Sequence, residues 1–378
     1  MQKIRLLIVD DSSTVRLMLA RQFESDPQLE VAATAVNGRI ALAKLEGLAP
    51  DVVVLDIEMP EMDGLETLAA LRKTHPALPV IMFSRLTDRG ARATVDALLL
   101  GANDYVLKPE CKADVEKAIR QELIGKIKLH ARGSVGKNQE AESGDLRAKN
   151  EVQQPENSEP RSLGKRPRAE VERPAFTAPG RKPAVIAIAV STGGPNALAT
   201  LLRQFPADLP VPILIAQHMP PEFTTALAER LGATTRLVVR EAGDDQPIDD
   251  ACVWIAAGNH HMVVQLDRGT VRVRRNQDPP ENSCRPSADV LFRSVAEVFG
   301  SAVLAVVLTG MGQDGLAGAR AIHEAGGQVL VQDKASSVVW GMPGAVAEAG
   351  LADQVLPLSQ LGAEIILRLQ LARNRIPS

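Results

Sequence analysis

Cysteine is scarce in this chain, which has three cysteines in 378 residues, at positions 111, 252 and 284. They stand far apart and form no Cys-x-x-Cys pair, which excludes a disulfide framework and a cysteine-rich zinc site. The six histidines are scattered apart from the pair His260–His261, and no His-Glu-x-x-His pattern occurs. Because that pattern marks many zinc hydrolases, its absence disfavours a metal hydrolase.

Long apolar runs are also missing. No run approaches the roughly 18 consecutive apolar residues that a membrane-spanning helix needs. Near the N-terminus, Asp10 and Asp11 directly follow a short apolar run, whereas a signal peptide needs a longer apolar stretch and a small-residue cleavage site. We therefore expect a cytoplasmic protein with no direct membrane insertion.

Neither end of the chain has an excess of basic residues. Residues 1–125 carry 15 Lys and Arg against 19 Asp and Glu, and residues 184–378 carry the same numbers. Nucleic-acid binding usually requires a basic face. The charge distribution therefore predicts no nucleic-acid partner. Together with the lack of a helix-turn-helix signature, it argues against a transcription factor.

The segment between these two parts has a different composition. Residues 126–183 carry 13 basic residues against 8 acidic ones, and most of the segment is rich in Glu, Lys, Arg, Pro, Ser, Gln and Gly. Such a segment cannot bury enough apolar area to offset its loss of chain entropy. We expect a largely disordered linker at 126–183, continuing from a helix near Ala113–His130, between domains at 1–125 and 184–378.

Short apolar runs alternate with amphipathic stretches in residues 1–125. The amphipathic stretches include Ser13–Phe23 and Leu65–Thr74. Because this alternation is typical of a parallel sheet with helices on both faces, we expect a doubly wound α/β domain. The runs expected to form its strands are Ile4–Val9, Val31–Ala35, Val52–Leu55, Val80–Phe83 and Tyr105–Leu107.

The same alternation returns after the linker and predicts a second doubly wound, Rossmann-like α/β domain. Two stretches of alternating polarity, Met262–Leu266 and Val271–Arg274, flank a short turn and predict an added β-hairpin. The expected strands are Ala184–Val190, Ile213–Ala216, Val253–Ala256, Val303–Leu308 and Val329–Val331. The expected helices are Ala197–Gln204, Thr224–Leu231, Asp289–Phe299 and Leu316–Ala325.

Acidic and polar residues follow the strands expected in the first domain. Asp10 and Asp11 follow the first strand, Asp56 the third, Ser84 the fourth and Lys108 the fifth. The carboxyl ends of the strands of a doubly wound sheet meet at one edge, where converging carboxylates repel unless a hard cation lies among them. Oxygen ligands suit Mg²⁺. A lysine there can balance an added phosphoryl group, and a hydroxyl can hydrogen-bond it.

Residues 1–122 resemble a two-component receiver domain, which implies a flavodoxin-like fold. The matching residues are Asp10-Asp11, Asp56 with Met59-Pro60 and Asp63-Gly64 downstream, Ser84, and Lys108-Pro109.

The receiver resemblance also implies roles for individual residues. The residue matching Asp56 accepts a phosphoryl group from a histidine kinase, and Mg²⁺ is held by Asp11, Asp56 and the main-chain carbonyl of Glu58. The aromatic switch residue near the fifth strand corresponds to Tyr105.

A serine follows the first strand expected in the second domain. The run Ala184–Val190 leads into Ser191-Thr192-Gly193-Gly194-Pro195. A serine at a strand end, with free N–H groups at the start of the next helix, is well placed to act as a nucleophile beside an oxyanion site. The same turn could cradle a phosphate, but it lacks the lysine of a P-loop and the spacing of a dinucleotide site.

A serine nucleophile needs a base, and the base needs an orienting acid. His218 follows a fully apolar strand, and His260, which also follows a strand, is the less favoured alternative. Asp314 lies in a Gly-rich loop after another strand. Ser191, His218 and Asp314 therefore predict a Ser-His-Asp arrangement at three strand ends. The chain order and the missing G-x-S-x-G elbow disfavour an α/β-hydrolase.

Across nearly its whole length the chain resembles the chemotaxis receptor methylesterase (CheB) family. The family implies that Ser191 is the nucleophile, His218 the base and Asp314 the orienting acid, with an oxyanion hole from the N–H groups of Thr192 and Met311. The residues that carry the resemblance are Ser191–Pro195, Gln217–Pro220, Gly258–His260, Arg285–Asp289 and Thr309–Gly315.

The family resemblance implies a reaction and its partners. The reaction is hydrolysis of glutamate methyl esters on the cytoplasmic domains of chemoreceptors, which releases methanol and serves chemotaxis adaptation. Many members also deamidate receptor glutamines. The implied partners are methylated receptors and a histidine kinase phosphodonor. Mg²⁺ is the implied cofactor of the receiver domain, and the esterase reaction needs none.

The chain departs from the family pattern at several positions. Val190 stands where smaller residues are common before the serine, Cys284 precedes the Arg-Pro-Ser motif, and Arg85 follows Ser84. The linker is longer and more polar than is usual. A different class of function, a phosphorylation-dependent module that binds other signalling proteins, is the alternative to the enzyme.

Overall fold

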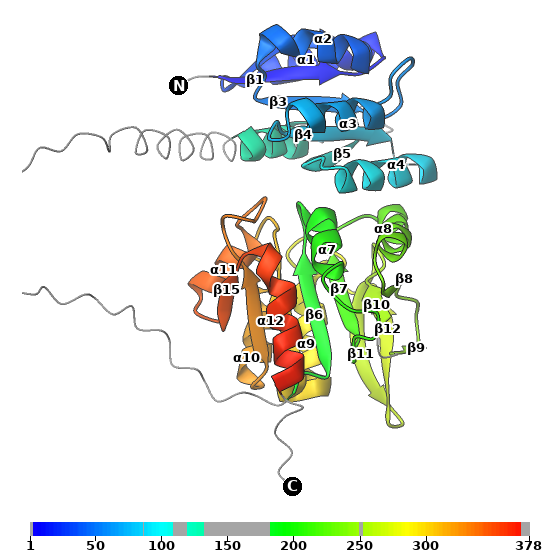
Figure 1. Ribbon diagram of the computed structural model, residues 1–378, viewed down its shortest axis with the longest axis vertical. Coiled ribbons are helices and arrows are strands. Elements are labelled where there is room, and N and C mark those ends of the chain that lie inside the picture. The colour runs from blue at the N-terminus through cyan, green and yellow to red at the C-terminus, as the bar shows by residue number, and fades with distance from the viewer. Residues whose placement is uncertain (1–2, 86, 109–118, 132–181, 249–251, 372–378) are drawn as a thin grey trace, which may run out of the picture.

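The computed structural model describes residues 3–85, 87–108, 119–131, 182–248 and 252–371. These residues form two α/β domains, one at each end of the chain (Figure 1). From residue 132 to 181 the expected linker lies outside the described residues, as does Pro109 of the receiver motif. No helix in the described part of the chain is both long and apolar enough to cross a membrane.

The N-terminal domain is a five-stranded parallel sheet in the order β2-β1-β3-β4-β5, so the predicted doubly wound fold is confirmed. Helices cover both of its faces, because side chains of successive strand residues point to opposite sides and both sets are apolar. The elements are β1 (Ile4–Val9), α1 (Ser13–Glu24), β2 (Leu29–Ala35), α2 (Gly38–Leu48), β3 (Val52–Asp56), α3 (Gly64–Thr74), β4 (Val80–Arg85), α4 (Asp88–Leu99), β5 (Asp104–Lys108) and the π-helix η1 (Ile119–Leu123), which continues as an α-helix over 124–131.

The packing of the N-terminal domain continues past the predicted domain boundary at residue 125. Ile127 and Ala131 are buried against α1 and the sheet, in the same apolar cluster as Phe23 and Ile119. On the opposite face, α2, α3 and α4 pack their leucines and alanines on the strands. The chain therefore leaves this domain from a helix that is anchored in its core.

The C-terminal domain is built on a seven-stranded parallel sheet in the order β15-β14-β13-β6-β7-β10-β8. Helices α7, α8 and α12 cover one face and α9, α10 and α11 the other. The elements are β6 (Val185–Val190), α7 (Gly194–Leu202), β7 (Ile213–Gln217), α8 (Pro221–Thr234), β8 (Val238–Glu241), β9 (Gln246–Pro247), β10 (Cys252–Ile255), β11 (His261–Asp267), β12 (Thr270–Asn276), α9 (Ala288–Phe299), η2 (Gly300–Ala302), β13 (Val303–Val307), α10 (Leu316–Glu324), β14 (Gln328–Gln332), α11 (Met342–Glu348), β15 (Gln354–Leu356) and α12 (Leu358–Leu371).

The expected β-hairpin is formed by β11 and β12, which pair antiparallel and join β9 in a separate three-stranded sheet. Arg268 and Gly269 connect the two strands with φ values of 48° and 83°. Two successive positive φ values give the tight turn whose twist matches that of the strands. The sequence analysis missed the edge strands β8 and β15, because they are short and half-exposed and form no continuous apolar run.

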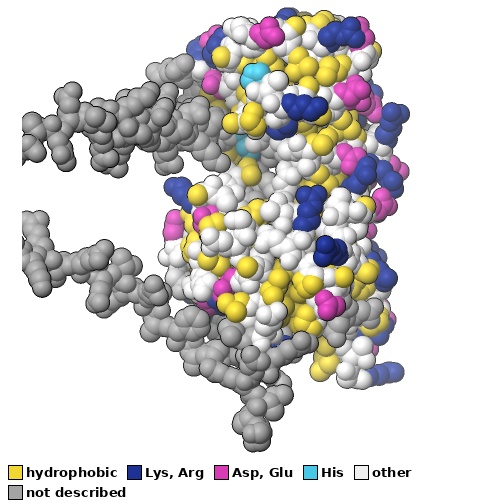
Figure 2. All heavy atoms as spheres, viewed as in Figure 1, with side chains coloured by type: hydrophobic (Ala, Val, Ile, Leu, Met, Phe, Trp, Pro, Cys, Tyr) yellow, Lys and Arg dark blue, Asp and Glu magenta, His cyan; other side chains and the backbone are white. Residues whose placement is uncertain are grey.

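The two domains contact each other through α4 of the first and α7 and α8 of the second (Figure 1). One apolar cluster runs through this contact without a break, from Val95 and Leu98 of α4 to Leu198 of α7 and Leu227 of α8. Figure 2 shows basic and acidic side chains close together along the right-hand edge, where α4 and α8 lie in Figure 1.

Two ion pairs connect α4 to α8 at the rim of the contact. The Arg92 guanidinium lies 3.1 Å from a Glu229 carboxylate oxygen, and Arg230 pairs with Asp96. Both pairs are partly exposed to solvent, so the buried leucines supply more of the interface energy than the charges do. The charged rim therefore orients a contact that apolar packing holds together.

Candidate active site

Ser191 lies at the point where the strand order of the C-terminal sheet reverses, between β6 and β13. It follows Val190 of β6, and its N–H donates a 3.0 Å hydrogen bond to the Thr309 carbonyl, which follows β13. The turn needs glycine at 193, where φ is +77° and a Cβ would come within 2.6 Å of Val338 Cγ2. In doubly wound sheets such a switch point is where ligands bind.

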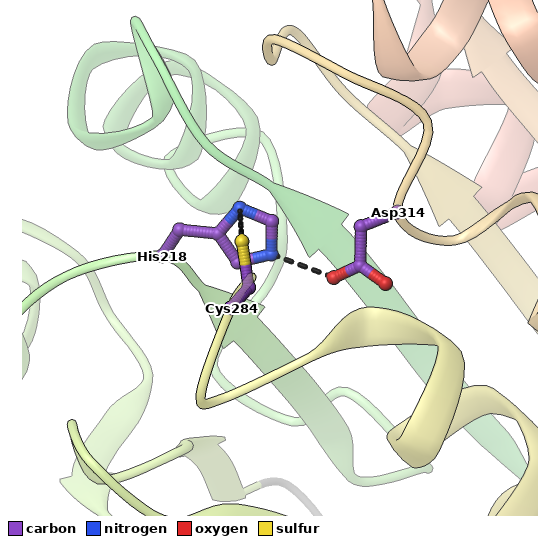
Figure 3. Close-up of side chains that lie close together, drawn as sticks. All are labelled: His218, Cys284 and Asp314. Carbon is purple, nitrogen blue, oxygen red and sulfur yellow. Dashed lines mark hydrogen bonds and ion pairs between the residues drawn. The ribbon is translucent and has the colours of Figure 1, made fainter. Parts of the chain in front are cut away.

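The structure brings His218 and Asp314 together from the ends of β7 and β13. The His218 Nε2 atom lies 2.7 Å from a carboxylate oxygen of Asp314 (Figure 3). The imidazole is 13% exposed and the carboxylate 2%. A buried, short contact of this kind fixes the ring orientation and leaves Nδ1 as the nitrogen that can exchange a proton.

Asp314 accepts hydrogen bonds from the start of α9 as well as from His218. The N–H groups of Ala288 and Asp289 donate at 2.6 and 3.1 Å, the Ser287 hydroxyl at 2.7 Å, and the Asn282 side-chain amide at 3.0 Å. Burial by itself raises the pKa of this carboxyl, but His218 and the donors at the helix start hold the pKa well below its usual range. The carboxylate is therefore charged and fully bonded.

Opposite Asp314, the thiol of Cys284 faces the other ring nitrogen of His218. The Sγ atom lies 3.4 Å from Nδ1 (Figure 3). Burial lowers the pKa of the imidazole, but hydrogen bonds with Asp314 and Cys284 and their charges outweigh burial and raise the pKa to about 9.

No hydrogen bond joins the Ser191 hydroxyl to His218 among the described residues. The Nδ1 atom of His218 contacts the Cys284 thiol instead. The expected His–Asp contact is thus present, whereas the expected Ser–His hydrogen bond is not formed in this arrangement. The alternative base, His260, lies elsewhere, with its Nδ1 3.1 Å from the Gly258 carbonyl.

The loop that carries Met311 passes directly over Ser191. A Cβ placed on Gly310 would lie 2.9 Å from Ser191 Cβ, so only glycine allows this approach. Within the described residues, neither the N–H of Met311 nor that of Thr192 donates a hydrogen bond to another group. Two free N–H groups thus flank the serine, which is the arrangement that an oxyanion site requires.

A cavity of about 570 Å³ opens over Ser191, and both domains line it. The C-terminal domain contributes Ser191, Thr192, His218 and the Cys284–Arg285 segment, and the N-terminal domain contributes Tyr105, Leu107, Glu122 and Lys126. The cavity therefore lies at the contact between the domains, and its size depends on how the N-terminal domain is placed.

In the N-terminal domain, Asp10, Asp11 and Asp56 converge at the ends of β1 and β3, with carboxylate oxygens within 4.8 Å of one another. Lys108 Nζ bridges Asp10 at 2.8 Å and Asp56 at 2.7 Å. Burial raises the pKa of Asp56 to about 6, against the opposing effect of Lys108. Clustered carboxylate oxygens are the donors that Mg²⁺ prefers, so this set fits that ion.

The remaining predicted receiver residues lie around this cluster. Ser84 is buried at the end of β4, and its hydroxyl donates to the Arg85 carbonyl at 3.3 Å. Glu58 follows β3 with an exposed side chain. Tyr105 lies farther away: its ring stacks on Phe223 of the C-terminal domain, with centroids 4.8 Å apart, and burial raises the pKa of its hydroxyl.

The sequence analysis assigned no role to several residues that the structure places at the site. Ser287 and Asn282 bond Asp314, Cys284 contacts His218, and Phe223 receives Tyr105. Ser287 precedes an amphipathic helix, and this pattern predicts an ordinary helix N-cap. Its hydroxyl bonds Asp314 instead of its own helix, and no local sequence pattern could indicate that.

Comparison with known proteins gives matches over both domains. Residues 186–365 match the family model described as CheB methylesterase, and residues 6–120 match the one described as response regulator receiver domain. The protein-glutamate methylesterase/protein-glutamine glutaminase of Trichodesmium erythraeum is 50% identical over 381 residues, which cover 98% of this chain and 100% of that protein.

Two further proteins match the chain. The protein of the same name from a Nocardioides species is 48% identical over 382 residues, which cover 99% of this chain and 97% of that protein. The crystal structure of the Thermotoga maritima CheB methylesterase catalytic domain is 39% identical, covers 49% of this chain and 98% of that chain, and has a TM-score of 0.48.

Proposed function

The chain belongs to the CheB methylesterase family, with a response regulator receiver domain preceding the catalytic domain, and on this premise we propose that it is a phosphorylation-controlled protein-glutamate methylesterase and protein-glutamine glutaminase. Its substrates are the methylated cytoplasmic domains of chemoreceptors, and its action serves chemotaxis adaptation. The observation that carries the proposal is the buried His218–Asp314 pair beside Ser191, at the switch point of the sheet.

In the first chemical step, the Ser191 hydroxyl attacks the carbonyl carbon of a glutamate methyl ester. His218 accepts the serine proton on Nδ1, because Nε2 is held by Asp314, and the Cys284 thiol has to give up its contact with Nδ1 for this transfer. The proton then passes from Nδ1 to the leaving methoxy oxygen, and methanol departs. With a glutamine substrate the leaving group is ammonia.

In the second step, water attacks the acyl-serine ester with His218 again as the base, and a glutamate carboxylate is released. In both steps negative charge develops on the carbonyl oxygen. The unpaired N–H groups of Thr192 and Met311 are placed to bind that oxygen, and removing one such donor typically costs about 10²–10³ in rate.

The receiver domain controls this chemistry through Asp56. The Asp56 carboxylate accepts a phosphoryl group from a histidine kinase. Asp11, Asp56 and the main-chain carbonyl of Glu58 are the groups that would hold the Mg²⁺ ion. When bound, the ion neutralises the charge on the phosphoryl oxygens. Lys108, which lies against Asp56 here, is placed to pair with the added group, and the Ser84 hydroxyl to hydrogen-bond it.

The contact between the domains supports inhibition in the unphosphorylated state. The receiver domain lines the cavity over Ser191, and a receptor helix has to reach the serine through that space. Phosphorylation activates the enzyme by favouring an arrangement in which this contact is loosened. Tyr105 is the residue through which the phosphorylated site acts, because its ring is itself part of the contact.

Methanol release from membranes carrying methylated receptors tests the assignment. Ser191→Ala and His218→Ala are each expected to reduce release by several orders of magnitude. His260→Ala is the matched control, since His260 also follows a strand but lies apart from Asp314, and it should retain release. Near-normal release from Ser191→Ala would contradict the proposal and favour a module that only binds signalling proteins.

A further inference from the structure

The thiol of Cys284 lies against the one imidazole nitrogen of His218 that Asp314 leaves free. The Sγ–Nδ1 distance is 3.4 Å. Thiolate sulfur and imidazole nitrogen are the two ligand types that Zn²⁺ binds most readily in proteins. The proposed reaction gives this thiol no step, so the pairing is open to a separate role.

The separation of the two atoms fits coordination to one metal ion. Zn²⁺ binds imidazole nitrogen at about 2.0–2.1 Å and thiolate sulfur at about 2.3 Å, usually with tetrahedral geometry. Two such ligands on one tetrahedral ion lie about 3.6 Å apart. The observed 3.4 Å differs from that value by less than a side-chain torsion can adjust.

Asp314 supports such a site without being a ligand itself. Its two oxygens are already taken by His218, Asn282 and the start of α9. Histidines that bind a metal commonly donate their second ring N–H to a carboxylate, which orients the ring and raises its basicity. His218 has that partner at 2.7 Å, so the metal-binding nitrogen is already aimed at Cys284.

The backbone around Cys284 is held in place on both sides. Its N–H donates to the Glu281 carbonyl at 2.9 Å, and its carbonyl accepts from the Glu281 N–H at 3.1 Å. The next residue, Arg285, is anchored by hydrogen bonds to Asn259 and to the Gln277 carbonyl. The thiol therefore projects from a fixed loop, which lowers the entropy lost on binding an ion.

We propose that Cys284 Sγ and His218 Nδ1 form a binding site for Zn²⁺, with its remaining coordination positions open to the cavity, and that the bound ion inhibits the enzyme reversibly. Two protein ligands are fewer than the three of catalytic zinc sites, so the ion is an exchangeable inhibitor and not a resident cofactor. The inhibition rests on the proposed role of His218, because the ion takes the nitrogen that has to accept the serine proton. Binding itself does not depend on that role.

Metal binding to the full-length chain tests the site directly. Equilibrium dialysis with Zn²⁺ measures affinity, and Co²⁺ used as a probe gives a thiolate-to-metal absorption band in the near ultraviolet. We expect Cys284→Ser to abolish this band and to weaken Zn²⁺ binding by at least about tenfold. Cys252→Ala is the matched control, because Cys252 starts β10 and does not line the cavity. A wild-type Co²⁺ complex without the thiolate band, or unchanged Zn²⁺ affinity in Cys284→Ser, would overturn the proposal.

The consequence for activity is measured separately. Zn²⁺ should inhibit methanol release by the wild type, and half-inhibition of Cys284→Ser, relative to its own metal-free rate, should need at least about tenfold more Zn²⁺. Equal sensitivity of the two proteins would refute inhibition through this site. The two proposals fail differently: activity of Ser191→Ala would overturn the esterase assignment and leave the Co²⁺ spectrum unchanged.

Discussion

The Tyr105 ring of the receiver domain stacks on the Phe223 ring of the catalytic domain, with centroids 4.8 Å apart and planes inclined by 15°. Lys126 also holds Tyr105, since its Nζ donates a 2.7 Å hydrogen bond to the Tyr105 carbonyl and lies 5.2 Å from the ring centroid. Any change that moves Tyr105 therefore also disturbs the domain contact, so the residue expected to act as the switch lies within the contact between the domains.

The ion pair between Asp96 and Arg230 gives a way to loosen this contact without touching either active site. Asp96→Arg sets two like charges opposite each other across the α4–α8 contact. Losing ~0.5–1 kcal/mol of interface energy should raise methanol release by the unphosphorylated enzyme about two- to fivefold. The double variant Asp96→Arg/Arg230→Asp restores opposite charges and should return the rate to that of the wild type. Equal rates for all three proteins would argue against inhibition through this contact.

The pH dependence of methanol release follows from the pKa of His218. The imidazole has to be neutral to accept the serine proton, and its partners raise its pKa to about 9. The value of kcat/KM should therefore rise with pH through the neutral range, reach half its maximum near pH 9 and level off above that pH. Asp314→Asn removes a negative charge that raises this pKa, so the rise should move to lower pH with a smaller plateau. A profile that is flat between pH 7 and 9 would contradict the assignment of His218 as the base.

Because Asp56 is the expected phosphorylation site, a phosphodonor with Mg²⁺ should activate the wild type and leave the Asp56→Asn variant unchanged. With Mg²⁺ and a small phosphodonor, the wild type should release methanol faster, whereas Asp56→Asn should show its basal rate throughout. Mg²⁺ alone should raise the thermal midpoint of the wild type, because it binds only where the acidic cluster is assembled. Asp208→Asn, in an exposed loop of the other domain, should respond like the wild type. Activation of Asp56→Asn by the phosphodonor would place the phosphorylation elsewhere.

Substituting Gly194, the first residue of α7, tests how closely the turn after Ser191 is packed. A Cβ on Gly194 would overlap the Gln217 side-chain oxygen and lie 2.8 Å from Val190 Cγ2. Gly194→Ala should therefore lower the free energy of unfolding by about 1–3 kcal/mol. It should also reduce methanol release, because the Gln217 amide holds the Ser191 carbonyl.

Gly47→Ala is the matched control for that substitution. Gly47 lies in the exposed face of α2 with nothing within 4 Å of a new Cβ. Alanine is a better helix former, so this variant should be unchanged in activity and up to about 1 kcal/mol more stable by denaturant unfolding. If Gly194→Ala behaved like Gly47→Ala, the close approach to Gln217 would not constrain the site.

The sequence by itself determined the two parallel sheets, because their strands are buried on both faces and appear as continuous apolar runs. It also placed Ser191, His218 and Asp314 in one region, since the carboxyl ends of parallel strands share an edge. It did not predict the half-exposed strands β8 and β15, whose formation depends on their neighbours in the sheet.

Only the tertiary structure decided which side chains face the imidazole. Cys284, which contacts His218, and Asn282, which hydrogen-bonds its partner Asp314, both lie far from these residues in the sequence, and their contacts depend on how the loop before α9 returns to the sheet. The same holds for Tyr105 and Phe223, which belong to different domains. Strand periodicity is a local property that backbone geometry imposes every two residues. The meeting of distant loops depends on the packing of the whole chain, which no local pattern encodes.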